Sequence, residues 1–192
     1  MLTIREVDKS YFPLYDQVTQ NVEVSSVYKV IRADGGLGGL VLEEVRTDPY
    51  VRDLSVYERA CDLENMFDLK NWRFYMAFDG DIPIGAATVA GKTEDLHLPG
   101  GMPDACVLWD IRLNDKYKHQ GLGRELFDLA VSGARADGYK KMLIECQNNN
   151  VTACRFYRRQ GAELTKIDMN AYCSEEGLED EVQFIWTLDL TR

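Results

Sequence analysis

The sequence is poor in the features that mark metal sites, disulfide frameworks and membrane spans. It has two histidines, and its five cysteines are odd in number, widely spaced and without a C-x-x-C pair. We therefore expect reduced thiols and no metal. No run approaches the roughly 20 apolar residues of a spanning helix. The first residues, MLTIREVDKS, carry early charges, unlike a signal peptide. These absences predict a cytoplasmic protein with no membrane partner.

Basic residues are fewer than acidic ones: the chain has 22 Lys and Arg and 32 Asp and Glu, which gives a formal net charge of −10. This balance repels nucleic acid, so we expect no nucleic-acid partner. It suits either a cationic partner or simple solubility. A chain of 192 residues is long enough for one well-buried core and too short for two ordinary domains. We expect a single domain over 1–192.

Apolar periodicity predicts an alternation of strands and helices. Strands are expected near 2–7, 22–30, 106–113, 141–147, 162–172 and 181–190, and a hairpin at 72–78 and 82–89 around Asp79-Gly80. Helices are expected over 55–70, over 121–137 and from Asn150 to Gly161. The glycine run 35–39 is interpreted as a turn or mobile loop, and 93–104 as an irregular loop. This order predicts an α/β fold with a partly antiparallel sheet and helices on both faces.

One motif joins a predicted buried strand to a predicted helix. Residues 118–123 read K-H-Q-G-L-G. Free N–H groups at a helix start, met by a glycine-bearing loop, suit a diphosphate. A dinucleotide-binding loop would begin with glycine at the strand end and have a third glycine where this chain has Leu126. No G-K-[ST] follows either, so neither common nucleotide loop is present.

This loop resembles the acetyl-CoA loop R/Q-x-x-G-x-G/A of the GNAT family of N-acetyltransferases. Gly121 and Gly123 match, and Lys118 stands where the family usually has Arg or Gln. Lysine keeps the positive charge for a pyrophosphate and loses the planar bidentate geometry. A second family signature, N-x-x-A-x-x-x-Y, is matched by Asn150 and Tyr157 with an alanine between them.

The resemblance covers about 60–190, with 1–57 as an N-terminal strand and helix extension. It implies the GNAT fold, an α/β architecture with a central, mixed, mostly antiparallel sheet of about seven strands. The middle strands would splay apart, and helices would cover both faces. Acetyl-CoA would lie in the cleft where 106–113 and 141–147 separate, and no metal would be needed.

The resemblance also implies which residues bind acetyl-CoA. Backbone groups of Ile111 and Leu113 would pair with the pantetheine arm as an added strand would, and Asn150 would contact the same arm. The pyrophosphate would be held by a run of consecutive loop residues: Lys118, His119, Gln120, Gly121, Leu122, Gly123 and Arg124.

Acetyl transfer to an amine requires a group that accepts a proton, because deprotonating an alkyl ammonium at pH 7 costs about 4–5 kcal/mol. Asp110 and Glu145, each in the middle of a predicted strand, are the predicted bases. For Asp110 the alternative is a structural pair with Arg112, and for Glu145 it is anchoring a loop backbone or orienting substrate. Many family members have an acid where this chain has Trp109. By resemblance, Tyr157 would be the general acid toward the leaving thiolate.

Two further stretches, ECQNNNVTACRFYRRQGAEL (145–164) and the tail from 167 to 190, are similar to streptothricin acetyltransferases, which acetylate the β-lysine amine of that antibiotic. We therefore predict an acetyl-CoA-dependent N-acetyltransferase acting on a primary amine of a small cationic acceptor, as a monomer or homodimer. A peptide or protein N-terminal or lysine acetyltransferase is one alternative. A non-catalytic acetyl-CoA-binding regulatory module is another.

Overall fold

The computed structural model describes residues 1–94, 96 and 102–192, so half of the predicted 93–104 loop lies outside the described residues. The chain forms two compact units. The first contains residues 1–21, 53–144 and 187–192, and the second contains residues 22–52 and 145–186. The expectation of one domain over the whole chain stays a prediction. Of the helices in the described ranges, none is both long enough and apolar enough to cross a bilayer.

The first unit is built on antiparallel strands. β1 (Leu2–Val7), β4 (Arg73–Asp79), β5 (Ile82–Ala90) and β6 (Ala105–Leu113) are neighbours in that order, and β6 pairs in parallel with the start of β7 (Lys141–Gln147). The chain turns from β4 to β5 at Gly80, whose φ of 62° suits a tight hairpin. The predicted hairpin and these strands are confirmed.

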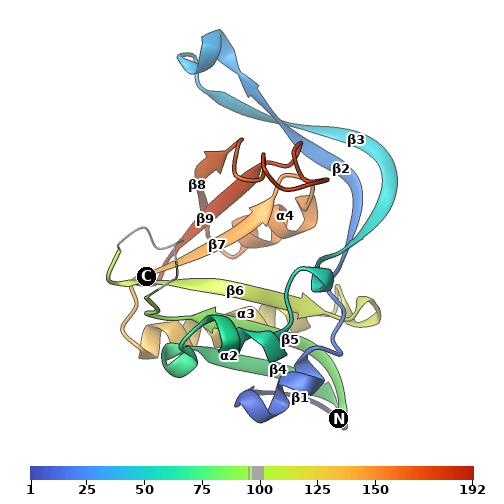
Figure 1. Cartoon of the computed structure of the whole chain (residues 1–192), viewed down its shortest axis with the longest axis vertical. Coiled ribbons are helices and arrows are strands. Elements are labelled where there is room, and N and C mark those ends of the chain that lie inside the picture. The colour runs from blue at the N-terminus through green and yellow to red at the C-terminus, as the bar shows by residue number, and fades with distance from the viewer. Residues whose placement is uncertain (95, 97–101) are drawn as a thin grey trace. The chain divides into compact units, whose positions relative to one another are not determined.

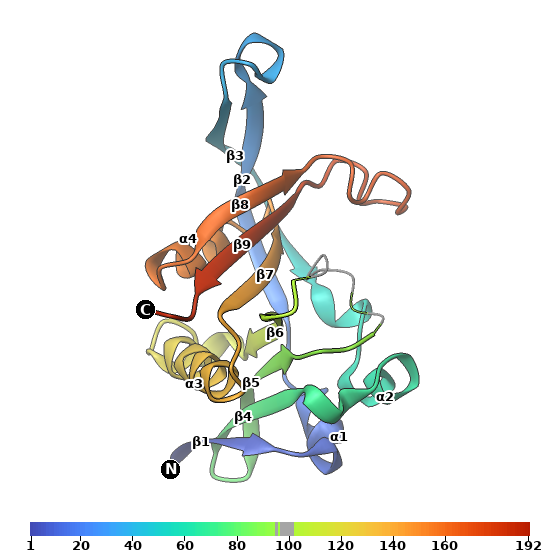
Figure 2. The same ribbon diagram turned by 90° about the vertical axis from the view of Figure 1, so that its left-hand side faces the viewer.

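Helices cover both faces of this sheet. α3 (Leu122–Ala136) lies on one face, and the short helices α1 (Phe12–Tyr15) and α2 (Leu63–Met66) lie on the other (Figures 1 and 2). α3 comes close to β4 at Gly133, where a Cβ atom would lie 1.9 Å from the hydroxyl oxygen of Tyr75. The predicted helix over 121–137 is confirmed.

The predicted helix over 55–70 is wrong. Short turns replace it: 3-10 segments at Leu54–Val56, Ala60–Asp62 and Leu69–Asn71, and α2 between the last two. Three aspartates explain the division, because each accepts backbone N–H groups that start a new turn. Asp53 accepts from Ser55, Asp68 accepts from Lys70, and Asp16 accepts from residues 60 and 61.

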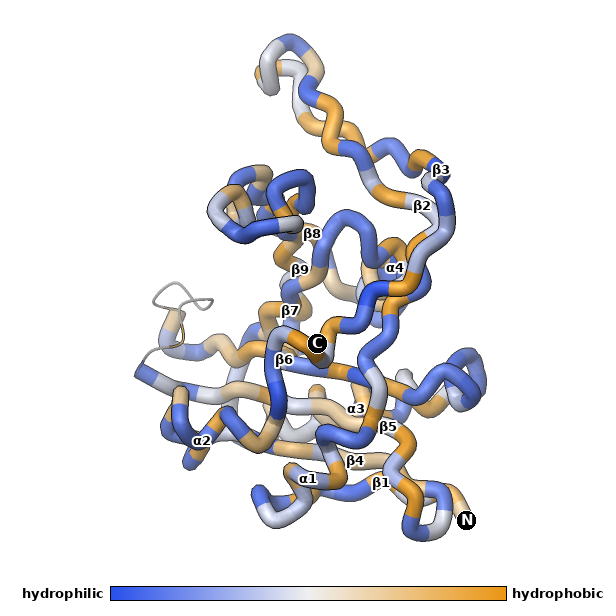
Figure 3. The backbone as a smooth tube through the Cα atoms, turned by 45° about the vertical axis from the view of Figure 1, so that its right-hand side comes forward, coloured by the Kyte–Doolittle hydropathy of each residue, from blue (hydrophilic) through white to orange (hydrophobic). Residues whose placement is uncertain are grey.

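The second unit holds a two-stranded ribbon, β2 (Asn21–Arg32) and β3 (Leu40–Asp53), whose turn contains the glycine run as predicted. β3 was not predicted from the sequence. Most of its side chains are exposed, so neither face of the strand has to be apolar. Hydrophobic and hydrophilic residues follow one another along it without the regular alternation that predicts a strand (Figure 3). Asn148 anchors the ribbon, because its carbonyl accepts from the Tyr28 N–H at 2.9 Å and its Nδ2 donates to the Tyr28 carbonyl at 3.0 Å.

The remaining elements of the second unit are the end of β7, α4 (Val151–Arg159), β8 (Glu163–Asp168) and β9 (Gln183–Asp189), with strand order β7-β9-β8. α4 ends before Gly161, which has φ 91°. The complete sheet has seven strands in the order β1-β4-β5-β6-β7-β9-β8. The predicted α/β class and the mostly antiparallel sheet are confirmed.

Candidate functional site

The K-H-Q-G-L-G segment forms a tight loop between β6 and α3. It follows a 3-10 turn, Asp115–Tyr117. Two residues take left-handed backbone conformations: His119 has φ 62°, and Gly121, the residue that precedes α3, has φ 93°. A glycine at 121 adopts this conformation without the cost that a side chain would carry. Both left-handed residues thus lie within the three positions that precede α3.

The backbone N–H groups of this loop are free to bind a ligand. Among the described residues, none of the N–H groups from His119 to Gly123 donates to a protein acceptor, and the next, that of Arg124, bonds to the Gly121 carbonyl at 2.9 Å. A Cβ atom at Gly121 or at Gly123 would meet no atom within 4 Å. Free N–H groups and the positive end of the α3 dipole suit an anion. The loop thus fits a diphosphate.

The basic side chains beside the loop are already paired with acids. Lys118 Nζ donates to the Asn21 carbonyl at 2.8 Å and forms an ion pair with Asp115 at 2.5 Å, and this bond to Lys118 lowers the pKa of Asp115. Arg124 lies 3.6 Å from Asp128 and is largely exposed. The loop's positive potential therefore comes mainly from its backbone, and binding of pyrophosphate by the Lys118 and Arg124 side chains stays a prediction.

Within the described part of the first unit, no strand pairs with the edge of β6 that leads into this loop. In this unit the pairing of β6 with β7 runs from Ala105 to Leu108. The Asn114 N–H donates to the Ile84 carbonyl of β5 at 2.9 Å. Backbone groups alternate between the two edges of a strand, so those of Ile111 and Leu113 point away from β5. These are the two positions predicted to pair with the pantetheine arm.

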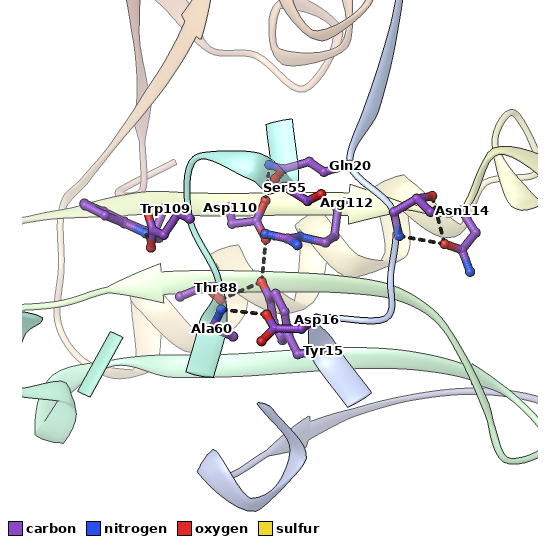
Figure 4. A network of polar contacts seen from close by, with 12 residues as sticks. Tyr15, Asp16, Gln20, Ser55, Ala60, Thr88, Trp109, Asp110, Arg112 and Asn114 are labelled. Carbon is purple, nitrogen blue, oxygen red and sulfur yellow. Dashed lines mark hydrogen bonds and ion pairs between the residues drawn. The ribbon is translucent and has the colours of Figure 1, made fainter. Parts of the chain in front are cut away.

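Asp110 lies in a buried network on β6 (Figure 4). Its Oδ2 accepts from Arg112 Nε at 2.6 Å and from the Tyr15 hydroxyl at 2.7 Å, and its Oδ1 accepts from Gln20 Nε2 at 2.7 Å. Burial and the charge of Asp110 raise the pKa of Tyr15. The structural pair with Arg112 is therefore present. A catalytic role for Asp110 stays a prediction. In that role the carboxylate would have to accept a proton from the substrate while it already accepts hydrogen bonds from three donors.

Sequence reasoning missed the carboxylate of Glu58, which lies beside Trp109. The indole Nε1 of Trp109 donates to Glu58 Oε1 at 2.6 Å. Burial raises the pKa of Glu58, and the bond from the indole only partly offsets that rise. The available signal was Trp109 itself, which occupies a position where many family members have an acid and whose N–H needs an acceptor when buried.

The other predicted residues lie in the second unit. Glu145 accepts a hydrogen bond from the Tyr172 hydroxyl at 2.6 Å, and burial and this carboxylate raise the pKa of Tyr172. Asn150 caps α4 as predicted, since its Oδ1 accepts from the Ala153 N–H at 3.1 Å. Tyr157 is buried on α4. Glu145 thus contacts a side chain and not a loop backbone, and its role as a base stays a prediction.

Known proteins share sequence and fold with this chain. Residues 41–162 match the sequence profile of the acetyltransferase (GNAT) family. A stretch of 95 residues is 26% identical to the ribosomal protein bS18-alanine N-acetyltransferase of Escherichia coli (strain K12). That match covers 50% of this chain, and the chain spans only 64% of that relative's length.

Two solved structures share the fold. One is a nourseothricin acetyltransferase, with a TM-score of 0.78 and 21% identity over 98% of each chain. The other is a Bacillus anthracis str. Ames protein, suggested to be a streptothricin acetyltransferase, in complex with acetyl coenzyme A. It has a TM-score of 0.78 and 20% identity over 98% of this chain and 99% of its own.

Proposed function

Because the chain belongs to the acetyltransferase (GNAT) family, we propose that it transfers the acetyl group of acetyl-CoA to a primary amine of a small cationic acceptor. The observation that carries this proposal is the run of N–H groups from His119 to Gly123, which donate to no acceptor among the described residues. The open space around a Cβ atom at Gly121 or Gly123 supports it. Such a run is suited to the diphosphate of coenzyme A.

Several of the predicted residues have a specific task in this proposal. The loop N–H groups bind the diphosphate, and the backbone groups of Ile111 and Leu113 orient the pantetheine arm. Acetyl-CoA supplies an acetyl thioester. The Asn150 Oδ1 is used in capping α4, which leaves its Nδ2 to donate to a carbonyl of the arm. Tyr157 donates a proton to the leaving sulfur, as a phenol can at neutral pH.

The acceptor that we propose to test first is the β-lysine amine of streptothricin. Two features support it: the similarity of residues 145–164 to streptothricin acetyltransferases, and the shared fold with the nourseothricin acetyltransferase. The formal charge of −10 would attract such a cation. The match to a ribosomal-protein alanine acetyltransferase supports a second acceptor class, a protein N-terminus.

Substitution of Gly123 tests the diphosphate site. In Gly123→Glu, a carboxylate near the start of α3 suits the helix dipole, so the fold is retained while the anion is repelled. Gly123→Ala is the matched control, because the family pattern accepts alanine here. By calorimetry we expect wild type and Gly123→Ala to bind acetyl-CoA, and Gly123→Glu to bind at least tenfold more weakly, about 1.4 kcal/mol.

Thiol release is then followed with streptothricin, free lysine, polyamines, aminoglycosides and short peptides. Turnover of the small cationic amines, with peptides ignored, supports the proposal. Turnover of peptides alone would assign the protein-acceptor alternative. Absence of acetyl-CoA binding by wild type at millimolar concentration would overturn the proposed function.

A further inference from the structure

Glu58 is a half-buried carboxylate with one unused oxygen. Its Oε1 accepts from the Trp109 indole at 2.6 Å, and within the described part of the chain no group donates to its Oε2. The segment that carries it is fixed, because the Asp16 carboxylate accepts from the N–H groups of Ala60 at 2.7 Å and of Cys61 at 3.2 Å (Figure 4). Glu58 is therefore held in place with capacity for one more strong donor.

An aromatic group lies next to this carboxylate. The ring of Trp109 is 5.3 Å from the ring of Phe67 and 5.3 Å from that of Trp72. Both Trp109 and Phe67 are half-buried, so part of each ring is accessible. Aromatic faces attract cations, and a carboxylate beside such faces is suited to an alkyl ammonium group. Glu58 and these rings together have the chemistry that recognises the acceptor proposed above.

Trp109 directly follows the part of β6 that pairs with β7 within the first unit. β6 pairs with β7 up to Leu108, and Trp109 is the next residue. The diphosphate loop follows the other end of β6, after Leu113. A ligand bound at the loop and extended along the free edge reaches Leu113 first and Ile111 next, and its far end lies toward Trp109. The carboxylate of Glu58 is thus at the end where a thioester would be.

Asp110, the predicted base on the same strand, is less suited than Glu58 to bind an ammonium group. The carboxylate of Asp110 already accepts from Arg112, Tyr15 and Gln20. Glu58 accepts from one neutral donor. The charged groups that act on Glu58 are Asp110, whose charge raises its pKa, and Arg112, whose charge lowers it. These opposite charges are paired with each other at 2.6 Å, so burial remains the main influence on the Glu58 pKa.

We propose that Glu58 binds the ammonium group of the acceptor and accepts its proton. This rests on the proposed function and adds a catalytic residue to it. One ammonium proton passes to the Glu58 carboxylate and leaves a lone pair on nitrogen. That pair forms the C–N bond to the acetyl carbon while the C–S bond breaks, with its electrons going to sulfur. Tyr157 donates its proton to that sulfur, the second nitrogen proton restores the Tyr157 phenol, and Glu58 releases its own proton to water.

The first test needs no turnover. Ionisation of Glu58 changes the environment of the Trp109 indole, so tryptophan fluorescence of the protein alone should change with pH. The transition should be centred above 4.5, the ordinary value for a glutamate, because burial raises the Glu58 pKa. It should be absent in Glu58→Gln and in Trp109→Phe. A wild-type transition that persists in Glu58→Gln would contradict the assignment.

The second test uses kinetics with an acceptor that wild type acetylates. Glu58→Gln keeps an oxygen for the Trp109 N–H and should lower kcat by roughly 10²–10⁴-fold, the usual contribution of a general base, with acetyl-CoA affinity unchanged. It should also abolish the acidic limb of kcat/KM. Trp109→Phe should move that limb to higher pH, because the indole bond lowers the Glu58 pKa. Glu64→Gln, in the same segment and paired with Lys9 at the surface, is the matched control and should behave as wild type.

The outcomes separate the two proposals. If wild type acetylates amines while Glu58→Gln keeps its kcat and its acidic limb, the Glu58 assignment is wrong and the proposed function stands. If wild type neither binds acetyl-CoA nor acetylates any amine of the panel, both are wrong.

Discussion

Replacing Asp110 by asparagine should destabilise the protein strongly. The change keeps the size of the side chain and removes its charge. Arg112, whose side chain is 5% exposed, would then keep a buried positive charge without the carboxylate that lies 2.6 Å from its Nε. Tyr15 would also lose a charged acceptor for its hydroxyl. A buried ion of this kind cannot recover in the interior the hydration that it lost on folding.

Breaking a buried ion pair from one side costs about 3–5 kcal/mol. For a chain of this length, each 1 kcal/mol moves the melting temperature by about 2–4 °C, so we expect a drop of roughly 6–20 °C. The exposed pair of Arg124 and Asp128 provides the control. Its four-residue spacing on a helix is worth only about 0.3–0.5 kcal/mol, so Asp128→Asn should be nearly silent.

Urea unfolding gives the stability of Asp110→Asn and of Asp128→Asn relative to wild type. A double variant then shows whether the stability lost in Asp110→Asn comes from leaving the Arg112 charge buried without its partner. Arg112→Met in the Asp110→Asn background removes the unpaired cation and should recover at least half of the lost stability, because paired replacement of a buried ion pair is often nearly neutral. A loss below about 1 kcal/mol in Asp110→Asn would refute the reasoning, since that is the range of an exposed pair. Arg112→Met is measured alone as well. A double variant whose loss of stability equals the Asp110→Asn loss plus the Arg112→Met loss would also refute the reasoning.

Two further predictions concern α4. Asn150→Ala removes the acceptor for the Ala153 N–H and should cost about 1 kcal/mol in urea unfolding, while Asn150→Asp should retain the cap; equal losses in both would show that the cap contributes nothing. Tyr157→Phe should lower kcat by roughly 10²-fold or more, as expected for loss of a general acid, with acetyl-CoA affinity within twofold of wild type in calorimetry. An unchanged kcat would remove Tyr157 from the mechanism.

The elements that could be predicted from sequence are those whose apolar residues are mostly buried. β5, β6, β7 and α3 are of this kind, and their predicted bounds differ from the observed ones by one residue or less. The 55–70 segment has helical spacing too, but Val56 is 72% exposed and Met66 is 46% exposed. Its conformation is decided by carboxylates that cap the backbone. One of these, Asp16, lies more than 40 positions away in the sequence, and no local pattern shows such a contact.

The same limit applies to the site. The loop from His119 to Gly123 was predictable because a diphosphate is bound by consecutive N–H groups, and consecutive residues form a readable motif. Glu58 was not, because its contact with Trp109 joins residues 51 positions apart. In the sequence it appeared as one more acidic residue on the exposed side of a predicted helix.

A β-bulge explains how one strand serves both stability and the proposed chemistry. Thr88 pairs with Asp110 and Val89 pairs with Leu108, so Trp109 is an extra residue with no partner on β5. Strict alternation would send Trp109 and Asp110 to opposite faces, whereas a bulge re-aims one side chain. Asp110 contacts Tyr15 of α1, and Trp109 contacts Phe67, which directly follows α2, on the same side of the sheet. The buried ion pair therefore fixes the strand immediately beside the residue that holds Glu58. It follows that a substitution at Asp110 should disturb the Trp109 fluorescence transition even in the fraction of protein that remains folded.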